Sequence, residues 1–326
     1  MADAVPPSTP QMPSSSDRIA AAIAKLRSLT QVNVQAQWRF FLGELPVSQA
    51  TQASSWQNWA PVTLNAKNHV SWAKGRQVLW LGQRIGVPHN LNGYPLQGLT
   101  LRLALTWWAE VAQIYVNGKR VQEGDLFDAT TRLLLSPAVS QNASFEVAIR
   151  LESPGHDNGA LVKSLCIYEL ADQSVSPPEP GFVADELAVL KEFLTASPDR
   201  LETVAQAVGQ LPWSVLTVCD RRSFDQSLTT LRQQLQPWGN FVKQRRIQLL
   251  GHAHLDMAWL WPLSETWQVA ERTFRSVLHL QKEFPELSYC HTTPALYEWM
   301  QNNRPELFAA IKAQVAAGRW EVAVAP

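Results

Sequence analysis

Two histidines and one aspartate lie within five residues of one another, at His252, His254 and Asp256, directly after the apolar run 247–251. Imidazole nitrogens and carboxylate oxygens are ligands that Zn²⁺ accepts in proteins. In an extended chain, residues two apart point to the same side, so His254 can converge with either Asp256 or His252. Spacing alone therefore predicts a metal site but leaves the pair of ligands open. A catalytic zinc usually has about three protein ligands, so further ligands would come from elsewhere.

The predicted metal site requires a strand that ends just before it. Residues 247–251 are expected to form this strand, and helical and β patterns alternate after it. The helices are expected at 265–283, 294–299 and 305–317, and the further strands at 287–291 and 320–324. This alternation indicates a parallel sheet, in which ligands bind beyond the carboxyl ends of the strands. Because three strands make an incomplete sheet, we expect residues 246–326 to be the first strand–helix units of a truncated parallel α/β barrel.

The region upstream of residue 246 is predicted to contain several further parts, so the chain is multidomain. Short alternating apolar segments separated by turn residues indicate antiparallel strands and a β-sandwich of the jelly-roll type. The hairpin around Ile114-Tyr115-Val116-Asn117-Gly118 and the many strands resemble the galactose-binding-like jelly rolls attached to many glycoside hydrolases. The expected parts are a disordered tail at 1–16, a helix at 17–30, the β-sandwich at 31–171, a proline-rich linker at 172–182 and a helical connection at 183–245. An apolar stripe within that connection predicts a packed helix and comprises Phe224, Leu228, Leu231 and Leu235.

The residues around the two histidines resemble the opening of the catalytic domain of glycoside hydrolase family 38, the α-mannosidases. The resemblance begins with the run GHAHLDMAWLWP at 251–262. It continues through Arg272-Thr273-Phe274, Phe284-Pro285-Glu286, Pro294-Ala295-Leu296-Tyr297-Glu298-Trp299, Pro305-Glu306-Leu307-Phe308 and Gly318-Arg319-Trp320-Glu321. The matched positions follow one another in the family's order from residue 247 to residue 326.

The resemblance to family 38 implies roles that spacing could not assign. It implies that His254 and Asp256 bind Zn²⁺, that Trp259 lines the sugar site, and that His252 supports the site without binding the metal. It also implies retaining hydrolysis by two carboxyl groups. The nucleophile and the remaining zinc ligands are expected beyond Pro326, so no catalytic residue is assigned within the chain.

The predicted function is therefore zinc-dependent, retaining hydrolysis of α-mannosides, with an α-mannoside oligosaccharide or glycan as the partner. We expect this N-terminal fragment to be nearly inactive alone, and a separate chain could supply the missing C-terminal part. Two alternatives remain open. One is a non-catalytic carbohydrate-binding module formed by the jelly roll and its tryptophans. The other is an amidohydrolase-like metal-dependent hydrolase that uses His252 and His254.

Composition narrows the classes of partner and the compartment. The chain has 28 basic and 28 acidic residues, so no excess of positive charge favours nucleic acid. It contains no run of about 18 apolar residues, and we expect no membrane span. Its three cysteines are widely spaced, which suits a reducing compartment. The N-terminus also lacks the basic and apolar regions of a secretory signal, so a cytoplasmic protein is expected.

Overall fold

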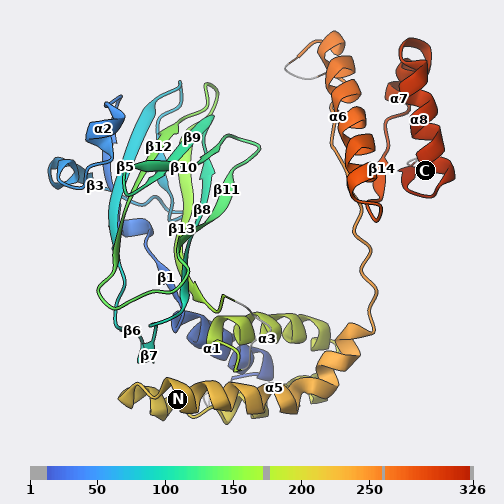
Figure 1. Ribbon diagram of the computed structural model, residues 1–326. Helices are drawn as coiled ribbons and strands as arrows, with labels where there is room; N and C mark the ends of the chain where they lie inside the picture. The colour runs from blue at the N-terminus through green and yellow to red at the C-terminus, as the bar shows by residue number, and fades with distance from the viewer. Residues whose placement is uncertain (1–12, 172–176, 259–260, 324–326) are drawn as a thin grey trace, which may run out of the picture. The chain divides into compact units, whose positions relative to one another are not determined.

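The computed structural model describes residues 13–171, 177–258 and 261–323. The chain divides into two compact units, Met1–Gln244 and Arg245–Pro326 (Figure 1). Most of the predicted disordered tail, residues 1–12, lies outside the described residues, as does 172–176 of the predicted linker. Within the described ranges, no helix combines the length and the apolar composition needed to cross a bilayer.

The larger part of the first unit consists of two antiparallel sheets that face each other (Figure 1). One sheet has the order β1 (Gln31–Asn33), β13 (Gly159–Glu169), β8 (Thr100–Trp108) and β11 (Thr130–Ser136), with β4 (Val70–Trp72) also paired to β13. The other has the order β10 (Lys119–Gly124), β9 (Val111–Val116), β12 (Ser144–Glu152), β5 (Val78–Gly86), β2 (Arg39–Leu42) and β3 (Ala60–Pro61). The shorter elements are the hairpin β6 (Asn90–Leu91) and β7 (Tyr94–Pro95), the helix α2 (Val47–Ala50), and the 3-10 turns η1 (Gln35–Gln37), η2 (Ser55–Asn58) and η3 (Trp213–Val218). The predicted sandwich-like domain is therefore confirmed.

Side-chain alternation explains why these strands form two layers. Leu103 of β8 and Ile149 of β12 are fully buried in one core shared by both sheets. Ala148, the neighbour of Ile149, lies instead in a second cluster with Trp80 and Trp56. Successive residues of a strand point to opposite faces, so the second sheet is covered by apolar side chains on both sides.

The predicted hairpin at Asn117-Gly118 is confirmed. It joins β9 to β10, with Val116 paired to Lys119. Asn117 has a φ of 49° and Gly118 a φ of 77°, the left-handed conformation that a tight two-residue turn requires at both positions.

Besides the short α2, the first unit contains the helices α1 (Ser15–Ser28), α3 (Pro180–Leu194), α4 (Pro198–Gly209) and α5 (Arg221–Lys243). The predicted helix at 17–30 begins earlier, because the Ser14 hydroxyl accepts the amide N–H of Asp17 and caps α1. Helices α3 and α4 both contact α1, so the segment predicted as a helical connection packs with the N-terminal helix in the same unit. The predicted packing stripe of α5 is confirmed, since Phe224, Leu228, Leu231 and Leu235 are all buried.

Helix α3 begins inside the segment predicted as a linker, because the side chain of Glu179 caps its N-terminus. Its carboxylate accepts the amide N–H groups of Gly181 at 2.5 Å and of Phe182 at 2.7 Å, which satisfies the first turn. Glu179 is only 3% exposed. Burial raises the pKa of its carboxyl from 4.5 to about 7, although the two amide donors act in the opposite direction.

The described residues of the second unit form two parallel strands and three helices. These are α6 (Leu263–Glu283), β14 (Tyr289–His291), α7 (Pro294–Asn303), α8 (Pro305–Ala316) and β15 (Trp320–Val322). Its core is aromatic and includes Phe274, Tyr297 and Trp320, all buried. The expected strand–helix alternation after residue 263 is present, and the strands pair in parallel as predicted.

The predicted strand at 247–251 is wrong. Ile247 is 79% exposed and Leu249 is 85% exposed, and only Gly251 pairs with β14, through a parallel bridge to Tyr289. An apolar run becomes a parallel strand only when neighbours pair with it and both of its faces are covered. Within the described residues, this segment pairs only at Gly251, and Ile247 and Leu249 remain largely exposed. In the part of this unit that the structure describes, there are two strands and one bridge, and the predicted truncated barrel is not confirmed.

Candidate metal centre

Apolar and polar side chains alternate along residues Gly251 to Met257, called the extended segment below. Ala253, Leu255 and Met257 pack against the aromatic core of the second unit. The residues between them are polar, and both histidines are exposed. Because an extended chain alternates its side chains, anchoring the apolar residues directs the polar ones away from the core. The sequence alternation alone therefore determines which face of this segment could bind a ligand.

His254 and Asp256 come together on that face. His254 Nε2 lies 2.9 Å from Asp256 Oδ1, and the two side chains are 81% and 41% exposed. When Nε2 carries the proton, the imidazole donates to the carboxylate; without that proton, nitrogen and oxygen offer two lone pairs to a cation. This donor set fits Zn²⁺. The pair can fill two positions of a coordination sphere. Within the described ranges, no group of three or more potential ligands is present, so these residues do not form a complete site.

His252 is directed elsewhere. Its Nδ1 lies 2.9 Å from the carbonyl oxygen of Cys290 in β14, which can only accept, so Nδ1 carries the proton. Its ring stacks on that of His291 with centroids 5.9 Å apart. His291 is only 1% exposed. Burial, followed by electrostatic repulsion from His252 and His254, lowers the pKa of His291 to about 4, so His291 is neutral at pH 7. His252 thus joins the extended segment to β14.

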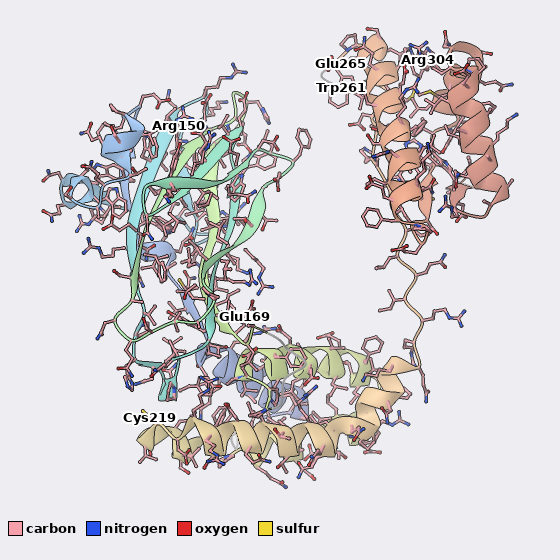
Figure 2. The ribbon with its side chains drawn as sticks, in the orientation of Figure 1. Arg150, Glu169, Cys219, Trp261, Glu265 and Arg304 are labelled. Carbon is pink, nitrogen blue, oxygen red and sulfur yellow. The ribbon has the colours of Figure 1, made fainter. Side chains whose placement is uncertain are left out.

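The predicted sugar-contacting residue Trp259 lies outside the described residues. The chain is described again from Trp261, which is labelled with Glu265 at the start of α6 in Figure 2. Trp261 Nε1–H donates to the hydroxyl oxygen of Thr266 at 3.1 Å. The same hydroxyl donates to the Met257 carbonyl at 2.6 Å. Thr266 therefore links the Met257 backbone to the Trp261 side chain.

Sequence reasoning missed Thr266, because a lone threonine in the first turn of a helix has no distinguishing pattern. It also missed a stacked pair of tryptophans, Trp267 of α6 and Trp299 of α7, whose rings are 5.4 Å apart and inclined by only 4°. The guanidinium of Arg304 lies 5.3 Å above the Trp299 ring. Both tryptophans are partly exposed, and only their spacing along two helices could have indicated the contact.

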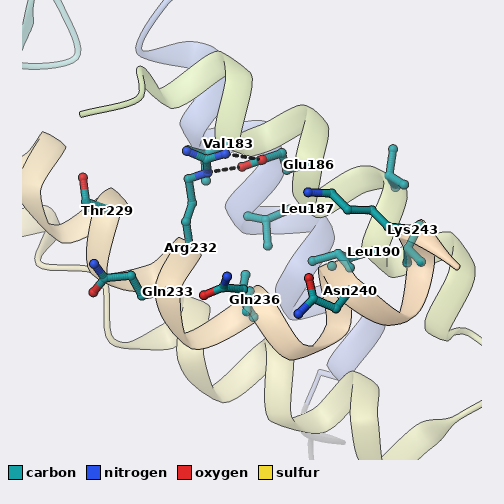
Figure 3. A pocket seen from close by; sticks show the side chains of 14 residues that line it. Val183, Glu186, Leu187, Leu190, Thr229, Arg232, Gln233, Gln236, Asn240 and Lys243 are labelled. Atoms are coloured by element: carbon teal, nitrogen blue, oxygen red, sulfur yellow. Dashed lines mark hydrogen bonds and ion pairs between the residues drawn. The ribbon is translucent and has the colours of Figure 1, made fainter. Parts of the chain in front are cut away.

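A separate groove of about 460 Å³ lies between α3 and α5 in the first unit (Figure 3). Its apolar wall includes Leu187 and Leu190. Across it, Arg232 of α5 makes two hydrogen bonds to the carboxylate of Glu186 in α3, at 2.7 and 2.8 Å. None of the predicted site residues lines this groove, and two of its charged residues, Glu186 and Arg232, are paired with each other.

The second unit matches a known protein family. Residues 244–325 match the Glycosyl hydrolases family 38 N-terminal domain. The extended segment with its histidines and aspartate, helix α6 and both parallel strands fall within the match. This segment of the chain therefore resembles a family 38 N-terminal domain, and the chain resembles a glycosidase of the α-mannosidase type.

The curated relatives are α-mannosidases. The chain is 27% identical over 103 residues to Alpha-mannosidase G of Dictyostelium discoideum, which covers 32% of this chain and 10% of that protein. It is 31% identical over 77 residues to human Alpha-mannosidase 2C1, covering 24% of this chain and 7% of that protein. It is 34% identical over 59 residues to Alpha-mannosidase of Saccharomyces cerevisiae, covering 18% of this chain and 5% of that protein. The chain thus matches a tenth or less of the length of these relatives.

Solved structures resemble the chain only loosely. A glycosyl hydrolase family 2 member from Bacteroides cellulosilyticus matches with a TM-score of 0.35 and 14% identity, over 44% of this chain and 21% of that one. Bacteroides uniformis beta-glucuronidase 2 matches with a TM-score of 0.34 and 17% identity, over 43% of this chain and 18% of that one. At such TM-scores, no property of these enzymes is transferred to this chain.

Proposed function

We propose that this chain is part of a zinc-dependent α-mannosidase and supplies two of its metal ligands, His254 and Asp256. The observation that carries the proposal is the 2.9 Å approach of His254 Nε2 to Asp256 Oδ1, within the segment that matches family 38. The proposed substrate is an α-linked mannoside of an oligosaccharide or glycan, in line with the names of the relatives. The free cysteines, Cys166, Cys219 and Cys290, are compatible with a reducing, cytoplasmic setting.

The residues of the extended segment have distinct proposed roles. His254 and Asp256 present a nitrogen and an oxygen on one face, and Zn²⁺ bound there would supply a Lewis acid for the hydroxyl groups of the sugar. Trp259 is proposed to contact the sugar face. His252 holds the segment against β14 through the Cys290 carbonyl, which supports His254 over His252 as the ligand. This arrangement favours the mannosidase pair of ligands over the amidohydrolase pair.

The carboxyl groups that would perform retaining hydrolysis are proposed to lie outside these 326 residues. The relatives are about ten or more times longer than the matched segment, which leaves room for the nucleophile, the acid and further zinc ligands. We expect the 326-residue chain alone to cleave a chromogenic α-mannoside at a rate indistinguishable from the D256A variant. Rapid turnover that requires Asp256 would contradict this part of the proposal.

The metal assignment is tested by titrating the metal-free full chain with Zn²⁺ and measuring heat. We expect H254A and D256A each to weaken binding by about tenfold or more, because each removes one of two ligands. The matched control is H279A. His279 Nε2 lies 3.1 Å from Glu283 Oε1 on the exposed side of α6, so it is also a histidine–carboxylate pair. An equal loss in H279A would mean that Zn²⁺ binds exposed pairs indiscriminately.

The H252A variant separates the two pairs of candidate ligands. In the proposed site, H252A retains most of the Zn²⁺ affinity because the His252 ring is hydrogen-bonded to β14. Loss of binding in H252A together with unchanged binding in D256A would favour the amidohydrolase-like alternative.

A further inference from the structure

Thr266 occupies the first turn of α6 and is only 1% exposed. Its hydroxyl group lies 2.6 Å from the Met257 carbonyl oxygen, 3.3 Å from the Asp256 carbonyl oxygen and 3.1 Å from Trp261 Nε1. A hydroxyl has one proton to donate and can accept at its lone pairs. The short distance assigns the proton to Met257, and the Trp261 N–H donates to the oxygen. This side chain is therefore hydrogen-bonded on both sides.

These contacts restrain the backbone at Asp256 and Met257, in addition to the packing of the neighbouring side chains. The side chains of Leu255 and Met257 anchor the extended segment to the core and so determine which face of it is exposed. Met257 is the last residue of this packed run. The Thr266 hydroxyl donates to the carbonyl of Met257 and lies 3.3 Å from that of Asp256, so it restrains the direction in which the backbone leaves Asp256. The orientation of the Asp256 carboxylate toward His254 depends on that direction.

We propose that Thr266 is the positioning residue for the Asp256 carboxylate, and that through it α6 sets the affinity of the His254–Asp256 pair for a divalent cation, Zn²⁺. This inference rests on the proposed function, since it assumes that the pair binds the metal. Thr266 does not itself contact the metal. Its hydroxyl group aligns the backbone that carries a ligand, and groups that orient a ligand typically change metal affinity by about 10- to 100-fold when removed.

The test compares Thr266→Val with Thr266→Ser in the full chain, using Zn²⁺ alone as the probe. Valine keeps the shape but removes the hydroxyl group, whereas serine keeps it. We expect T266V to weaken Zn²⁺ binding by about tenfold and T266S to remain within about twofold of the natural chain. Circular dichroism establishes that each variant is folded; if T266V is not, T266A removes the same hydroxyl with less crowding and takes its place.

A variant destabilised elsewhere in the same unit separates positioning from general loss of stability. Tyr297 Oη accepts the indole N–H of Trp320 at 2.9 Å in the buried core, and Y297F removes that acceptor. We expect Y297F to lower the melting temperature while leaving Zn²⁺ affinity unchanged. An equal loss of affinity in Y297F and T266V would overturn the positioning role.

The same titrations distinguish failure of this inference from failure of the proposed function. If D256A loses Zn²⁺ but T266V binds like the natural chain, Thr266 does not position the ligand and the metal site stands. If D256A binds Zn²⁺ as tightly as the natural chain, the proposed metal site itself is wrong. Failure of serine to rescue the affinity would also contradict the role assigned to the hydroxyl group.

Discussion

The buried carboxyl of Glu179 should make the stability of the first unit depend on pH in an unusual direction. Burial raises its pKa from 4.5 to about 7; the amides of Gly181 and Phe182 oppose the shift, and the nearby charges of Glu169 and Asp185 add to it. The folded state therefore holds the proton more tightly than the unfolded chain. Its stabilising contribution is fully present below about pH 4.5 and is lost as the pH rises through about 7.

The size of the effect follows from the two pKa values of Glu179. Each pKa unit corresponds to about 1.4 kcal/mol, so the whole shift amounts to about 3 kcal/mol, of which about 2 kcal/mol falls between pH 5 and 7.5. Glutamine has nearly the same shape as glutamate and keeps an oxygen that can accept an amide N–H, but it does not titrate. The E179Q variant should therefore lack this part of the pH dependence.

The assay is urea unfolding of the full chain and of E179Q, followed by circular dichroism across this pH range. Between pH 5 and 7.5, the free energy of unfolding of the natural chain should fall by about 2 kcal/mol relative to E179Q. The matched control is E192Q, on the same helix, because the Glu192 side chain is 76% exposed. The free energy of unfolding of the natural chain relative to E179Q could instead stay constant or rise with pH. Either result would refute the assignment of a raised pKa to Glu179.

Two further predictions concern the contacts between the β6–β7 hairpin and the helical segment of the first unit. A Cβ at Gly93 would lie 2.1 Å from the Leu216 carbonyl oxygen, and the residue has a φ of +85°, so G93A should lower the free energy of unfolding by about 2 kcal/mol or more. G118A, at a φ of +77° with nothing within 4 Å, should cost only about 1 kcal/mol; equal losses would show that the close approach is unimportant. Y94F removes the hydroxyl that donates to Asp225 Oδ1 at 2.8 Å and leaves a buried carboxylate less satisfied, which should cost about 2 kcal/mol in the same urea assay. A change within experimental error would mean that water replaces the lost donor.

Local patterns in the sequence determined much of this protein. The alternation through Ala253, Leu255 and Met257 already indicates which side of the segment presents the polar residues, because period-two alternation needs no distant partner. The Asn117-Gly118 turn and the apolar stripe of α5 were predictable for the same reason: each depends on residues a few positions apart. Family resemblance then narrowed the ligands to His254 and Asp256, a choice that spacing left open.

Only the tertiary structure decided the features that depend on contacts between residues far apart in the sequence. The apolar run at 247–250 resembles a strand, yet its residues remain largely exposed because only the following Gly251 meets a neighbouring strand. By spacing alone, His252 and His254 were equivalent as ligands, whereas in the structure the Cys290 carbonyl of β14 lies beside the His252 ring. Thr266 had no signal at all, since its role requires the Met257 carbonyl to lie within reach of its hydroxyl. A hydrogen bond or a strand pairing is a property of two segments, and a pattern within one segment cannot specify where the other will lie.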